Sequence, residues 1–184
     1  PIFIDRDPVS FNSDLDEVEK VLLSSKYQNV KAIIPVHFAG QLVDNERINN
    51  IAKKYNLFIL EDAAHAFEAV GNRCGNHKSK NSVAFSFYAN KNITTGGEGG
   101  AIATNDILLA NKIRKLSLHG MDKDGWKRFD SKGKWAYDVS ELGYKYNMTD
   151  ISAALGLEQF KNINKWHEIR CAYSDYYNKK FKDI

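Results

Sequence analysis

Short apolar runs alternate with amphipathic stretches along the first third of the chain. Three runs favour buried strands: Ile2–Asp5, Lys31–Phe38 and Leu57–Leu60. Apolar residues spaced three and four apart predict helices between them, over about residues 14–25 and 46–55. Ser13 or Asp14 is the expected N-cap of the first helix. Strands that alternate with helices predict parallel pairing, and strands apolar on both faces need helices on both. We therefore expect a three-layer α/β fold with a mostly parallel sheet.

The second half of the chain predicts two more strands and two more helices. Strands are expected at Ser82–Tyr88 and Ala101–Thr104, a glycine-rich turn at Gly96–Gly100, a helix at about 106–118 and a long loop at 119–148. From an N-cap at Thr149, apolar residues repeat at helical spacing as far as Phe181. This predicts one helix about 48 Å long at a rise of about 1.5 Å per residue. Such a helix is longer than a domain of this size is wide, so its far end should pack against a second domain.

The chain is therefore expected to be an internal piece of a longer protein. It begins at Pro1, without Met and directly in an apolar run. We assign residues 1–160 to part of a major domain, with its N-terminal segment missing, and residues 161–184 to a helix leading to a small C-terminal domain that the chain lacks.

The composition is that of an ordinary globular chain. It has 184 residues, 43% of them hydrophobic, and a net charge of +3, which is too small to indicate a nucleic-acid or membrane partner. Since no run of about 18 apolar residues occurs, no membrane span is expected. Cys74 and Cys171 lack CxxC spacing. We therefore expect neither a disulfide framework nor a metal site, and a reducing, cytoplasmic compartment.

Three residues near expected strand ends carry candidate chemistry. Asp62 follows the strand that ends at Leu60, and ligands of parallel sheets bind beyond the carboxyl ends of the strands. Lys91 leaves an aromatic strand and enters the glycine-rich turn, five residues after Ser86. Taken alone, Asp62 fits a simple acidic strand end equally well, and a lone lysine is usually a surface residue. Together the three match the needs of pyridoxal phosphate: an amine for a Schiff base, a carboxylate for the pyridine nitrogen and a hydroxyl for the phosphate.

Six stretches occur in a specific order over essentially the whole chain. They are Pro35–Gly40, Glu61–Phe67, Phe85–Lys91, Asn92–Gly100, Leu118–Gly120, and Leu142–Ile151 followed by Ala153–Gly156. The chain thereby resembles the DegT/DnrJ/EryC1/StrS sugar aminotransferases, which have the aspartate-aminotransferase fold. The resemblance implies a pyridoxal phosphate enzyme. An amino-acid donor, glutamate in the family, would give its amino group to the cofactor, which would then aminate a keto group of a nucleotide-linked deoxysugar.

The resemblance also implies roles for single residues. Lys91 matches the lysine that bears the Schiff base and moves the proton during transamination, and Asp62 matches the partner of the pyridine nitrogen. His65 matches a position near the ring hydroxyl of the cofactor, and Ser86 matches a phosphate ligand. His37 matches a family position too, where structural hydrogen bonding is the favoured interpretation.

A second segment of the family reaches across a two-fold dimer interface towards the phosphate of the neighbouring subunit. Gly143–Asn147 matches this segment, so the resemblance implies a homodimer with a shared active site. Many members have Asn where this chain has Lys145, and Arg where it has Asn147. A cation and an amide can each bind phosphate, so both residues are candidates.

Two alternatives stay open at this stage. The first is a sugar dehydratase of the same fold, which uses pyridoxamine phosphate and has His in place of the lysine, so Lys91 argues against it. The second is a truncated, non-catalytic relative that binds the cofactor or regulates.

Overall fold

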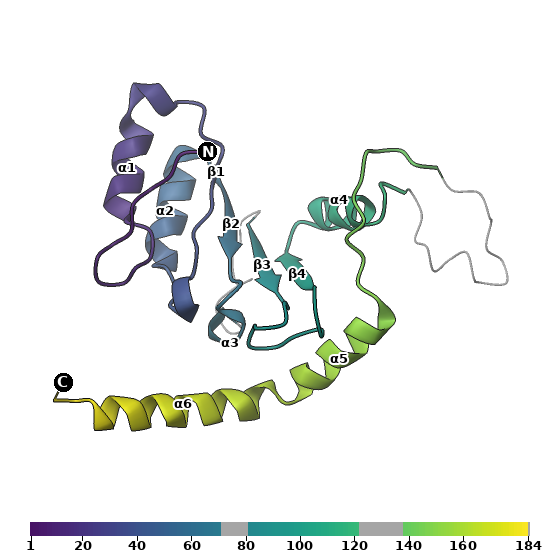
Figure 1. Ribbon diagram of the computed structural model, residues 1–184. Helices are drawn as coiled ribbons and strands as arrows, with labels where there is room; N and C mark the ends of the chain where they lie inside the picture. The colour runs from purple at the N-terminus through teal and green to yellow at the C-terminus, as the bar shows by residue number, and fades with distance from the viewer. Residues whose placement is uncertain (71–80, 122–137, 184) are drawn as a thin grey trace.

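The computed structural model describes residues 1–70, 81–121 and 138–183 (Figure 1). Its strands are β1 (Ala32–Ile33), β2 (Phe58–Asp62), β3 (Ser82–Ser86) and β4 (Gly100–Thr104). Its α-helices are α1 (Leu15–Leu23), α2 (Asn45–Tyr55), α3 (Phe67–Val70), α4 (Ile107–Ser117), α5 (Asp150–Lys161) and α6 (Ile163–Lys180).

In the described residues the strands form one sheet in the order β1-β2-β3-β4. The first three strands are parallel, whereas β4 runs antiparallel to β3. The register places Asp62 beside Ala84 and Phe85 beside Ala101. The predicted α/β fold with a mostly parallel sheet is therefore confirmed.

One face of the sheet is packed against helices. Successive residues of a strand point to opposite faces, and this face carries Ile59, Val83 and Phe85. The N-caps of α1 and α2 are Asp14 and Asp44, whose side chains accept hydrogen bonds from backbone N–H groups of the first turn. Their apolar sides pack on the sheet in one core cluster. Its buried members are Leu15, Val18, Val43, Ile48, Ile51, Ala52 and Ile59.

The opposite face of the sheet carries Asp62, Ala84 and Ser86, which share one side because paired residues of neighbouring strands point the same way. Apolar side chains beside them remain in contact with solvent. Ile34 is 60% exposed and Ile102 is 47% exposed. In the described part of the chain, Asp62 and Ser86 thus lie on the more open face of the sheet.

The first two predicted strands differ from the structure. No strand forms at Ile2–Asp5, where the prediction was wrong; the chain instead turns back on itself through an isolated bridge between Arg6 and Ser13. The Asp7 carboxylate stabilises this turn by accepting from the N–H groups of Val9 and Ser10 at 3.0 and 2.6 Å. A strand was expected over Lys31–Phe38, but it is regular only over β1. Pro35 lacks the N–H that a ladder requires.

The predicted single helix from Thr149 is two helices, which meet at an angle at Asn162 (Figure 1). The side-chain Nδ2 of Asn162 donates to the carbonyl of Glu158 at 3.0 Å, and its backbone N–H donates to Gln159 at 3.1 Å. This local bonding competes with the regular helical pattern. Thr149 is the N-cap of α5, as predicted. Of the predicted long loop, residues 122–137 lie outside the described residues.

None of the described helices is both long enough and apolar enough to cross a lipid bilayer.

Candidate functional site

Two of the predicted site residues end neighbouring strands. Asp62 is the last residue of β2 and Ser86 is the last residue of β3. Because these strands are parallel, both residues lie at the carboxyl edge of the sheet, and Asp62 and Ala84 are register partners. Ser86 follows Ala84 by two residues, so its side chain and that of Asp62 point to the same face. The fold therefore places a carboxylate and a hydroxyl on the same face at one edge of the sheet.

The chain turns sharply after Asp62. Its Oδ1 accepts a hydrogen bond from the backbone N–H of Ala64 at 3.0 Å. Ala63 is fully buried below this turn, whereas the predicted site residue His65 is exposed within it. The Asp62 side chain is thus oriented by its own turn, between its bridge partner Val36 and its register partner Ala84.

Lys91 lies in a loop that leaves the same edge from β3. The hydroxyl of Ser86 accepts from the N–H of Tyr88 at 3.3 Å, and the N–H of Lys91 donates to the carbonyl of Tyr88 at 3.0 Å. Phe87 closes the loop by donating to Gly99 at 2.7 Å and accepting from Thr95 at 3.1 Å. Lys91 itself is half-buried. Its amine is therefore carried by a folded loop rather than by a free surface segment.

A glycine is needed where this loop returns to the sheet. A Cβ at Gly99 would lie 2.1 Å from the hydroxyl oxygen of Thr95, which is impossibly close. That hydroxyl in turn donates to the carbonyl of Glu98 at 2.9 Å. The glycine-rich sequence after Lys91 thus allows a tight return into β4.

These residues fit the chemical demands of pyridoxal phosphate. Asp62 offers a carboxylate, Ser86 a hydroxyl and Lys91 an amine, all from the carboxyl ends of adjacent strands. Ala84, the register partner of Asp62 on the same face, adds little bulk beside it, and the half-buried Ala64 is also small. Among the described residues, no group of three or more His, Cys, Asp or Glu side chains could hold a metal ion.

The other two predicted residues, Lys145 and Asn147, lie elsewhere. Their segment runs beside the end of α4, where the N–H of Tyr144 donates to the carbonyl of Leu116 at 2.7 Å and Lys145 bridges to Leu118. The Lys145 amine donates to the side-chain oxygen of Asn147, and both residues are exposed. Within the described residues, no hydrogen bond or ion pair joins either of them to Asp62, Ser86 or Lys91.

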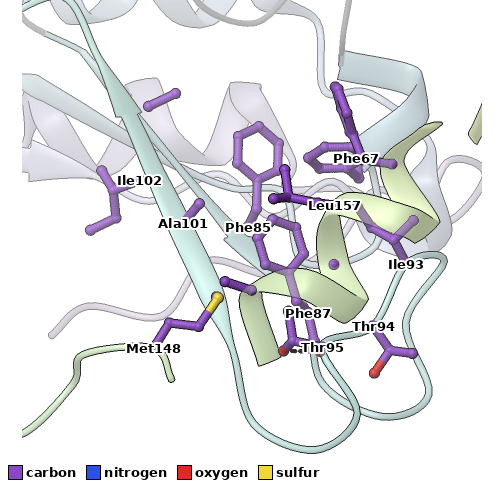
Figure 2. Close-up of a pocket in the computed structure, with 14 residues that line it drawn as sticks. Phe67, Phe85, Phe87, Ile93, Thr94, Thr95, Ala101, Ile102, Met148 and Leu157 are labelled. Carbon is purple, nitrogen blue, oxygen red and sulfur yellow. Dashed lines mark hydrogen bonds between the residues drawn. The ribbon is translucent and has the colours of Figure 1, made fainter. Parts of the chain in front are cut away.

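An apolar pocket of about 460 Å³ lies on the other side of the sheet, between β3, β4 and α5 (Figure 2). Phe85 and Phe87 point into it from β3 and its extension, and Leu157 faces them from α5. Asp62, Ser86 and Lys91 are not among its lining residues. Apart from the hydroxyls of Thr94 and Thr95 the lining is apolar, and it offers no carboxylate for a pyridine nitrogen. We therefore assign the candidate site to the opposite face.

The sequence alone did not indicate one further candidate residue, Glu68. Glu68 follows directly after the stretch Glu61–Phe67 and contacts both Asn92, next to Lys91, and Arg170 on α6. Arg170 is 102 residues away in the sequence. No local pattern connects residues at that separation, so only the fold reveals the contact.

Comparison with known proteins gives consistent matches over the whole chain. The sequence model of the DegT/DnrJ/EryC1/StrS aminotransferase family matches residues 1–184. The chain is similar to the spore coat polysaccharide biosynthesis protein SpsC of Bacillus subtilis, with 42% identity over 184 residues that cover 100% of the chain and 46% of SpsC. GDP-perosamine synthase of Caulobacter vibrioides is 38% identical over 183 residues, which cover 98% of the chain and 44% of the synthase.

The fold is similar to that of Spr1654 from Streptococcus pneumoniae, solved in its PMP-form. The TM-score is 0.80 at 31% identity, covering 100% of the chain and 50% of Spr1654. The chain spans about half the length of the curated relatives it matches.

Proposed function

The chain belongs to the DegT/DnrJ/EryC1/StrS aminotransferase family, and we propose that its protein uses pyridoxal phosphate to transfer an amino group to a keto group of a nucleotide-linked deoxysugar. One observation carries this proposal: Asp62 and Ser86 lie on one face at adjacent strand ends, and Lys91 follows in a folded loop from the same edge. Two relatives support the substrate class and the cofactor. One is named GDP-perosamine synthase, and the other is solved in a PMP-form.

Each residue has a separate task in this proposal. The cofactor, when bound, supplies the electron sink that lets an amino group exchange between two carbon atoms. Lys91 would hold the cofactor covalently through its amine and would move the proton during the amino transfer. Asp62 keeps the pyridine nitrogen protonated by pairing with it, and Ser86 donates to the phosphate. His65, exposed in the turn after Asp62, would bind near the ring hydroxyl.

We propose L-glutamate as the amino donor and a homodimer with a shared active site. Lys145 and Asn147 are exposed and bonded to one another rather than to the residues at the sheet edge. This is the arrangement expected if they bind the phosphate in the neighbouring subunit.

The break at Asn162 lies close to the proposed boundary between residues 1–160 of the major domain and residues 161–184, the helix towards the small domain. Cys171 is a free thiol, which fits a reducing, cytoplasmic compartment.

The decisive experiment locates the covalent bond. The full-length protein, loaded with pyridoxal phosphate, should show an absorbance band near the visible range that borohydride removes. Mass mapping should then find the reduced adduct on Lys91, and Lys91→Ala should lose both the adduct and the amination of a keto sugar. Lys112→Ala, which changes an exposed lysine of α4, serves as the control. An adduct on another lysine, or turnover retained by Lys91→Ala, would contradict the proposal.

A further inference from the structure

Glu68 connects three segments that are distant in the sequence. It lies on the short helix α3, which follows the turn after Asp62. One of its carboxylate oxygens accepts from the side-chain amide of Asn92, and the other pairs with the Arg170 guanidinium. Asn92 is the residue directly after Lys91, and Arg170 lies on α6. One carboxylate therefore joins the loop between β3 and β4 (residues 87–99, the Lys91 loop) to α6 near the other end of the chain.

The position of Glu68 is fixed by its neighbour in the chain. Phe67 packs edge-to-face on Phe85 at 5.1 Å between ring centroids, on Phe87 at 5.6 Å and on Phe160 at 6.1 Å. These contacts fix α3 to β3, to the start of the Lys91 loop and to α5 (Figure 2). The backbone of Glu68 is thus held in place whether or not its carboxylate is bonded.

Burial makes the two partners of Glu68 necessary. Its side chain is only 8% exposed, whereas that of Arg170 is 42% exposed. Burying a carboxylate costs free energy unless a cation and hydrogen-bond donors compensate for its lost hydration. Arg170 supplies the cation and Asn92 supplies a donor, and hydrogen bonds to a charged group are among the stronger ones in proteins. Asn92 thus donates a charge-assisted hydrogen bond to a carboxylate that is itself held in a mostly buried position.

The residues that follow Asn92 are fixed as well. Ile93 is 4% exposed, and the N–H of Thr94 donates to the side chain of Gln159 on α5 at 3.1 Å. Lys91 consequently has firm attachments directly after it in the chain. Of these attachments, the one at Asn92 is the nearest to Lys91.

We propose that Glu68 is a positioning residue, which holds the Lys91 loop against α6 through Asn92 and Arg170 and so fixes the place of the Lys91 amine. The proposal rests on the function proposed above for Lys91. It assigns no contact between Glu68 and the cofactor or the substrate; Glu68 acts only through the loop.

The first test needs no cofactor. In the full-length, cofactor-free protein, Glu68→Gln should raise amide hydrogen exchange over residues 91–95 and over α6 around Arg170, because the charged bridge is lost. Glu158→Gln is the matched control, since it removes the same charge from an exposed ion pair with Lys161 on α5. It should leave exchange over residues 91–95 unchanged. Unchanged exchange over 91–95 in Glu68→Gln, or a uniform rise over the whole chain, would overturn the proposal.

The second test follows release of the cofactor from the loaded protein. Glu68→Gln should speed release roughly tenfold, the effect of about 1.4 kcal/mol, and Glu158→Gln should not. If Glu68→Gln fails to fold, Asn92→Ala, which alters an exposed side chain, removes the loop side of the bridge alone. Arg170→Met should speed release in the wild-type background and have no further effect once Glu68 is changed. Additive effects of the two changes would contradict the shared bridge.

The two proposals can fail separately. If borohydride places no adduct on Lys91, the proposed function fails, whereas exchange in the cofactor-free protein still tests Glu68. If the adduct is on Lys91 and Glu68→Gln leaves exchange over 91–95 unchanged, the role of Glu68 alone is refuted.

Discussion

His37 and Glu61 form a hydrogen bond in the interior, with 2.8 Å between Nε2 of the histidine and Oε2 of the glutamate. The two side chains are 0% and 1% exposed. The other ring nitrogen of His37 accepts from the N–H of Val43 at 3.1 Å, so the ring proton lies on Nε2 and is donated to Glu61. The pair lies on the helix-covered face of the sheet, opposite the side chain of Asp62, and the N–H of His37 donates to the carbonyl of Asp62 at 3.0 Å. His37 thus has the structural role that the sequence favoured.

Replacing this histidine should be costly. His37→Ala would remove the hydrogen-bond partner of Val43 N–H and a donor to the buried Glu61 carboxylate, and we expect the free energy of unfolding to fall by about 3 kcal/mol. Urea unfolding followed by circular dichroism measures the loss. His167→Ala on α6, where the histidine is exposed, should change the stability little. A loss for His37→Ala no larger than that of this control would show that the buried pair adds nothing to stability.

Ser86 and Ser82 provide a matched pair on one face of β3. Ser86→Ala should weaken binding of pyridoxal phosphate to the full-length protein by roughly 10- to 100-fold, because one hydrogen bond to a charged group is lost. Ser82 lies four residues earlier on the same strand, and its buried hydroxyl has no hydrogen-bond partner among the described residues. Ser82→Ala should leave cofactor binding unchanged and raise the free energy of unfolding by about 1 kcal/mol. Titration by absorbance and urea unfolding give the two values, and equal weakening by both variants would refute the role of Ser86.

Local patterns were sufficient to predict most elements of the fold. The helical spacing of Ile48, Ile51, Ala52 and Tyr55 predicted α2, and the apolar run at Leu57–Leu60 predicted β2. The period of a helix or strand is a property of neighbouring residues, so the sequence carries it directly. The same alternation places Asp62 and Ser86 on one face once the register of β2 and β3 is known.

The errors arose where a single residue overrides its local pattern, or where contacts join distant residues. Pro35 lacks a ladder donor and shortens β1, and the side chain of Asn162 interrupts the long helix by bonding to Glu158. The bridge between Glu68 and Arg170 depends on tertiary packing, which no periodicity reports. The sequence therefore indicated the residues at the sheet edge but not the network that holds their loop.

The break between α5 and α6 can be tested directly. Asn162→Ala removes the side-chain bond to the carbonyl of Glu158 and introduces a residue of high helix propensity, so we expect α5 and α6 to join into one straighter helix. Spin labels on exposed positions of the two helices should report a longer distance in the variant. Asn164→Ala, at an exposed position two residues later, is the control and should leave the distance unchanged. Identical distances in wild type and Asn162→Ala would mean that another contact causes the break.

The surface ion pair between α1 and α2 should make stability depend on acid pH. The hydrogen bond from the Arg47 guanidinium lowers the pKa of Asp16 below its ordinary 3.8. The unfolded chain therefore binds a proton at Asp16 more readily than the folded chain, and the stabilisation by this pair is present above about pH 4 and is lost as the pH falls through the native pKa. We expect Asp16→Asn to be less stable than wild type near neutral pH, with the difference vanishing in acid.

Because both side chains of this ion pair are partly exposed, salt should also reduce the difference in stability. Urea unfolding at a series of pH values measures it. In an Arg47→Gln background the effect of Asp16→Asn should be smaller, because only the contributions of Lys20 and of the helix N-terminus remain. A wild-type advantage that persists below the native pKa of Asp16 would show that the side chain stabilises the helices by some means other than its charge.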